Sequence, residues 1–77
     1  MLSQLDALEL VAQKEPEYAR KSAMELIVDF ADRNGYKITN GKKEVRKATI
    51  AFFRQMNGVK ELNAQQIKQM EKILNLK

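Results

Sequence analysis

The spacing of the helix-breaking residues constrains this chain more than any other feature. The 77 residues include one proline and three glycines, at Pro16, Gly35, Gly41 and Gly58. The segments between them are rich in Leu, Ala, Lys, Glu, Gln and Met, which are good helix formers. Apolar side chains recur there at three- and four-residue steps, as in amphipathic helices. The sequence therefore predicts an all-α fold, a compact bundle of four helices over residues 4–14, 16–33, 42–56 and 64–75, within one domain spanning 1–77.

Signals at the ends of these segments support the predicted boundaries. Ser3 with Asp6, and Asn63 with Gln66, have the three-residue spacing of N-terminal capping boxes. Pro16 suits the first position of the second helix, where its missing N–H group costs nothing. A C-terminal stop is expected where an Asn-Gly pair follows a helix, at residues 34–35 and 57–58.

The apolar residues also predict how the helices pack. Those of the second helix cover roughly 200° of its circumference, so this helix should lie centrally and pack on more than one side. The connection over residues 36–41 is expected to be a loop with Ile38 turned inward. We expect the tyrosines and phenylalanines in or near the core. The predicted core-facing side chains of the last two helices are Val45, Ala48, Thr49, Phe52, Phe53 and Met56, then Ile67, Met70, Ile73 and Leu74, with Leu62 packing on Ile67.

The connection between the last two helices is compatible with a helix-turn-helix motif. It is about six residues long and contains Gly58. Arg54, however, occupies the position where that motif usually has a small residue. The last helix is also less basic than the third, although it should be the one that reads DNA.

The missing residue types argue against catalysis. The chain has no histidine and no cysteine, so it lacks the commonest general base and the commonest metal ligands. Ser3 and Ser22 have no histidine to activate them. The acidic row of Glu25, Asp29 and Asp32 runs along a helix rather than around a point. We therefore expect no enzymatic activity, no cofactor and no metal.

The same composition indicates where the protein acts. Small secreted domains usually rely on disulfides, so a chain without cysteine is expected in the cytoplasm. No apolar run is long enough to cross a membrane. The N-terminal segment also lacks the basic region of a signal peptide, so we expect an unprocessed protein that has no membrane partner.

Charge is distributed unevenly along the sequence. Residues 1–32 have a net charge of −4, whereas residues 33–54 carry seven basic side chains against one glutamate. On the third helix Lys43, Lys47 and Arg54 share a row opposite the predicted apolar face, with Ile50 inside the row. The candidate contact residues are Lys37, Lys42, Lys43, Arg46, Lys47, Ile50 and Arg54.

Several interpretations of this basic row remain open. It can contact a nucleic-acid backbone, with Ile50 against a sugar or thymine methyl and Tyr36 stacked on a base. The lysines after Gly41, in the first turn of the third helix, provide a weak phosphate-site signal. The row can instead dock an acidic protein surface, or only keep the protein soluble. It can also pair with the acidic row, within the fold or across a homodimer, in which exposed apolar residues (Leu10, Val28 and Ile50) would be buried.

Overall fold

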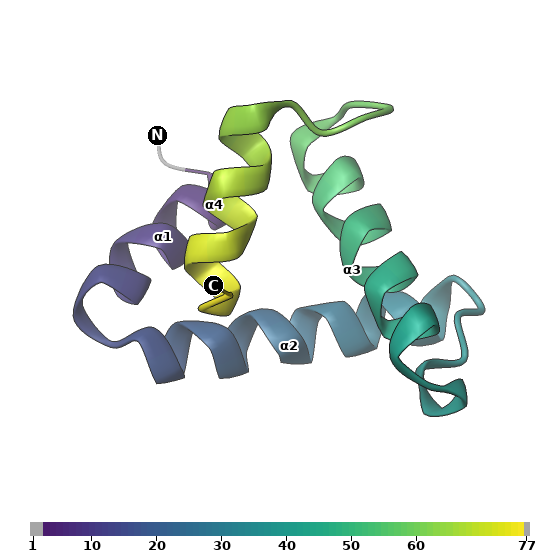
Figure 1. Cartoon of the computed structure of the whole chain (residues 1–77). Coiled ribbons are helices and arrows are strands. Elements are labelled where there is room, and N and C mark those ends of the chain that lie inside the picture. Colours follow the sequence, from purple (N-terminus) through teal and green to yellow (C-terminus); the bar gives the residue numbers. More distant parts are fainter. Residues whose placement is uncertain (1–2, 77) are drawn as a thin grey trace.

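A computed structural model describes residues 3–76, which form four α-helices and one short 3₁₀ helix. Helix α2 is the base on which the other helices pack, with α1 and α4 over one part of it and α3 over its far end (Figure 1). No strand occurs within the described residues. The predicted all-α architecture of four helices is confirmed. The helices are α1 Gln4–Lys14, α2 Pro16–Arg33, α3 Lys42–Asn57 and α4 Ala64–Leu74, with the 3₁₀ helix η1 at Ile38–Asn40.

The predicted boundaries agree with the structure to within one residue. The third helix ends at 57 instead of 56, and the fourth ends at 74 instead of 75. Both predicted capping boxes form, at Ser3 in front of α1 and at Asn63 in front of α4. Gly35 and Gly58 adopt positive φ angles of 78° and 65° after α2 and α3. A side chain with a Cβ is strained in this region, so glycine is the residue that ends a helix there most easily.

The core confirms the central position predicted for α2. Four of its side chains are fully buried, and three of these are alanines, whose small size lets neighbouring backbones approach closely. Helices α1, α3 and α4 all contact α2, and α1 also contacts α4. The core consists of Leu5, Ala19, Ala23, Ile27, Ala31, Ala48, Phe52, Phe53, Ile73 and Leu74.

Three side chains predicted to lie in or near the core are exposed. Ile67 is 40% exposed, Met56 is 37% exposed and Tyr18 is 57% exposed. The reason for Ile67 is that α4 packs against α1 and α2, and α3 does not cover its remaining side. Ile73 and Leu74 therefore fill the core, while Ile67 faces a groove.

The segment before α3 differs from the predicted loop, and the segment after α3 differs from a helix-turn-helix connection. The connection before α3 contains η1, and Ile38 packs against the core as predicted. After α3, the chain from Gly58 to Asn63 leads into α4, but α3 and α4 are not among the helix pairs that pack extensively. A helix-turn-helix motif needs its two helices packed together, so the fold gives that interpretation no support.

Candidate functional site

One face of α3 is buried in the core, and the opposite face is basic and exposed. Ala48, Phe52 and Phe53 are buried against α2 and its neighbours. The Thr49 hydroxyl donates a hydrogen bond to the Val45 carbonyl oxygen at 2.7 Å, which satisfies the one buried polar side chain of this face. The row on the opposite side is exposed along its whole length, and consists of Lys43, Lys47 and Arg54. This row is named the outer row below.

Most cations of the candidate set have no acidic partner among residues 3–76. Lys47 is the exception, since its Nζ lies 4.0 Å from Glu44 Oε1 in an exposed i, i+3 pair. Such pairs contribute little stability and compete weakly with a ligand. The acidic row on α2 does not pair with the outer row, and Asp29 instead lies 3.1 Å from Arg33 Nε on its own helix. The charges on the outer row are therefore available to an anionic partner.

The candidate residues lie on two surfaces of α3. Lys42, Arg46 and Ile50 lie apart from the outer row and line a groove between α3 and α4, where Lys42 and Arg46 are still exposed. The groove has a volume of about 770 Å³, and Arg20 of α2 contributes a third cation to it. Its apolar lining includes Met24, Val45, Ile67, Met70, Leu74 and Leu76. Ile50 is half-buried on this side, so it borders the outer row rather than interrupting it.

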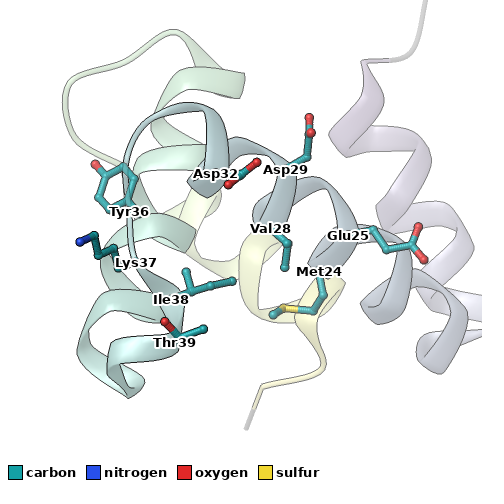
Figure 2. A pocket seen from close by; sticks show the side chains of 9 residues that line it. All are labelled: Met24, Glu25, Val28, Asp29, Asp32, Tyr36, Lys37, Ile38 and Thr39. Carbon is teal, nitrogen blue, oxygen red and sulfur yellow. The ribbon is translucent and has the colours of Figure 1, made fainter.

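A second pocket adjoins the groove along α2. It has a volume of about 690 Å³ between α2 and the segment 36–39. Figure 2 shows Met24, Val28 and Ile38 pointing into this space, with the carboxylates of the acidic row along α2. The second pocket is named the acidic pocket below, because the acidic row of α2 lines it. Met24 lines both the groove and the acidic pocket, so the two meet at this side chain.

The two remaining predicted contacts, Lys37 and Tyr36, lie in the acidic pocket and not on the outer row. The amino group of Lys37 points away from the α2 carboxylates (Figure 2). The Tyr36 ring stacks on Phe30, with 6.1 Å between ring centroids and 25° between ring planes. One face of the Tyr36 ring is thus occupied within the fold, which leaves less of it for stacking on a base.

The sequence-based reasoning missed three groove residues, Arg20, Ile67 and Met70. Arg20 belongs to an acidic helix, and no basic run draws attention to it. Ile67 and Met70 have the spacing of core residues, and that spacing is the same whether the neighbouring helix closes over them or not. The groove exists because α3 and α4 are separated, and this separation is a property of the tertiary structure alone.

Residues 3–76 contain neither a cluster of candidate metal ligands nor a helix that could span a membrane. No group of three or more acidic side chains within residues 3–76 is arranged so that it could hold a metal ion. Over the same residues, every helix is too short or too polar to span a lipid bilayer.

Comparisons with known proteins give no family for the chain. No protein-family model matches it, and no curated protein or solved structure is significantly similar to it. The charges and surfaces of the chain itself are therefore the basis for inferring its function.

Proposed function

We propose that this chain is a small, non-catalytic, cytoplasmic nucleic-acid-binding protein that contacts the phosphate backbone through the outer row of α3. The observation that carries the proposal is the exposure of Lys43, Lys47 and Arg54 on one face of a helix whose other face is buried. Glu44 is the only acidic residue among the sixteen of this helix. A local excess of positive charge of this kind is the electrostatic signature of backbone binding.

The length of the outer row matches a run of phosphates. Lys43 and Arg54 are eleven positions apart, which corresponds to about 16 Å along a helix. Phosphates of one DNA strand rise by about 3.4 Å each along the duplex axis but also wind around it, so a straight row of this length reaches only a few of them. Arg46 lies next to the row, at the edge of the groove, and is the fourth cation within reach of the same backbone.

The salt dependence of binding tests this proposal. If about four phosphates are contacted, log K for a random-sequence duplex should fall against log salt with a slope of about −3.6. The Lys43→Glu/Lys47→Glu variant should weaken binding and reduce the slope to about −1.8, because two of those contacts are lost. Fluorescence anisotropy with DNA and RNA of equal length, over a range of salt concentrations, measures both quantities.

A matched control separates the outer row from net charge alone. Lys14 and Lys68 are also exposed lysines, on α1 and α4. The Lys14→Glu/Lys68→Glu variant has the same net charge as the outer-row variant and should retain most of the binding and most of the slope. Equal losses in the two variants, or no binding by the wild type at low salt, would refute the proposal.

The groove supports a second candidate function, docking of an acidic protein surface. Its apolar lining is rimmed by Arg20, Lys42 and Arg46 against a single acid, Glu71. An apolar centre with a charged rim is the usual anatomy of a protein interface. A pull-down from nuclease-treated extract distinguishes the two functions, because protein partners held through nucleic acid are lost and partners held directly remain.

A further inference from the structure

Four side chains at every fourth position form a row on the pocket-lining flank of α2. They are Arg20, Met24, Val28 and Asp32, and each lines the groove, the acidic pocket or both. Val28 is 44% exposed and the Arg20 side chain is also 44% exposed. Positions four apart form a ridge on a helix surface, and the usual packing of two such ridges crosses the helices at about −50°. Within residues 3–76, Met24 packs partly against the core, and Arg20 lies 4.0 Å from Glu17 in an exposed pair on its own helix. Val28 and Asp32, in contrast, are exposed.

The order of residues along the ridge is complementary to itself. It begins with a cation, continues with two apolar side chains and ends with an anion. If two copies of the ridge meet in antiparallel orientation about a two-fold axis at the level of Leu26, Arg20 of each copy faces Asp32 of the other. Met24 of each copy then faces Val28 of the other. The pairing gives Asp32 a cation, gives Arg20 a second anion beside its weak exposed pair with Glu17, and covers both apolar residues in one symmetric contact.

We propose that the occupant of this surface is a second copy of the chain, bound through antiparallel packing of α2 on α2. The two pockets explain why the charges extend beyond the ridge. Arg20 shares the groove with Lys42 and Arg46, while Asp32 shares its pocket with Asp29. In the dimer the basic groove of each copy faces the acidic pocket of the other, and this opposition holds the two copies in register.

One residue, Glu25, should weaken the proposed dimer, and this expectation provides a further test. Glu25 lies beside the two-fold axis on the acidic side of the ridge, so the two copies bring their Glu25 carboxylates to the same side of the interface. Like charges placed in this way weaken association. The Glu25→Gln variant should therefore dimerise more tightly than the wild type, although it changes no predicted favourable contact.

The decisive experiment is a charge swap followed by sedimentation equilibrium. Arg20→Glu alone places two pairs of acids across the interface, and Asp32→Lys alone places two pairs of bases there. Each variant alone should dimerise at least about tenfold more weakly, since about 1.4 kcal/mol corresponds to a factor of ten. An equimolar mixture of the two should form a heterodimer with two restored pairs, and the double variant Arg20→Glu/Asp32→Lys should recover homodimerisation.

Controls keep the result independent of folding and of nucleic-acid binding. The substituted side chains lie on the surface, and circular dichroism should show unchanged helix content in each variant. Lys43→Glu/Lys47→Glu lies outside the ridge and should dimerise like the wild type. A wild type that stays monomeric at millimolar concentration would overturn the proposal. So would single variants that associate as tightly as the wild type, or a mixture that shows no recovery.

Discussion

At the scale of single residues, Asp6 shows how a polar contact connects local and tertiary structure. The Ser3 hydroxyl oxygen accepts a hydrogen bond from the Asp6 amide at 3.1 Å, and the Asp6 carboxylate accepts one from the Ser3 amide. The Gln69 side-chain amide of α4 donates to Asp6 and also to Glu9, at 3.0 Å each. Hydrogen bonds from the Ser3 side chain, and then from Gln69, lower the pKa of Asp6 below its ordinary value of 3.8.

This shift predicts a pH dependence of folding stability. Because the pKa of Asp6 is lower in the folded state, the folded state favours the ionised carboxylate, and the resulting stabilisation is present above pH 3.8 and lost as the pH falls through the folded pKa. Wild type should therefore be more stable than Asp6→Asn at pH 7, and the difference should shrink in acid. Urea unfolding of both proteins between pH 7 and pH 2.5 measures it. A constant difference across this range would contradict the assignment.

At the scale of elements, α4 is stabilised at both ends as well as by its packing. The Asn63 side-chain oxygen accepts a hydrogen bond from the Gln66 backbone amide at 2.8 Å, and the Gln66 side-chain oxygen accepts one from the Asn63 backbone amide at 2.9 Å. At the other end, Asn75 closes the helix in the left-handed region at φ 56°. Only Ile73 and Leu74 of α4 are buried, so the caps add to the packing contribution of few side chains.

Removing the cap of α4 should destabilise the whole protein measurably. Asn63→Ala should cost about 1 kcal/mol, which corresponds to a decrease in Tm of about 4–8 °C in a chain of this size. Gln65→Ala is the matched control, because Gln65 is exposed in the same turn and takes no part in the capping box. Thermal denaturation followed by circular dichroism compares the two. The interpretation fails if both variants unfold at the same temperature.

At the scale of the whole molecule, stability depends on a few large side chains in a small core. The largest fully buried ones are Phe53, Ile27 and Ile73. Phe53 packs edge-on against Phe52 at 5.3 Å between ring centroids, and Phe52 packs in the same way against Phe30 of α2. This row of aromatic rings is part of the contact between α3 and α2, and α2 in turn contacts α1 and α4.

Truncation of a side chain to alanine should have very different effects on stability at two positions of α3. Phe53→Ala should cost about 3–5 kcal/mol, a large part of the stability expected of a domain of this size, so the variant should be largely unfolded at room temperature. Met56→Ala, three residues along, should cost well under 1 kcal/mol because Met56 is 37% exposed. Urea unfolding and helix content distinguish them, and similar losses at both positions would contradict the burial pattern.

The sequence by itself determined the helices and their ends, because both depend on neighbours within four residues. Capping boxes, a proline at a first helical position and glycines at positive φ act locally, and so the four helices were predicted to within one residue. The exposure of Lys43, Lys47 and Arg54 was also predictable, since a helical period fixes which residues lie opposite an apolar face.

Only the tertiary structure decided which apolar side chains are buried and how the basic residues divide between surfaces. Helical period assigns Ile67 and Met56 to the same faces as true core residues, but burial needs a neighbouring helix, and α3 and α4 diverge on α2. The same divergence places Lys42, Arg46 and Ile50 along a groove with Arg20, on a different side of α3 from the outer row. Helix packing is a long-range property, so neither the groove nor the position of the Arg20-to-Asp32 ridge beside it could be assigned from the spacing of residues alone.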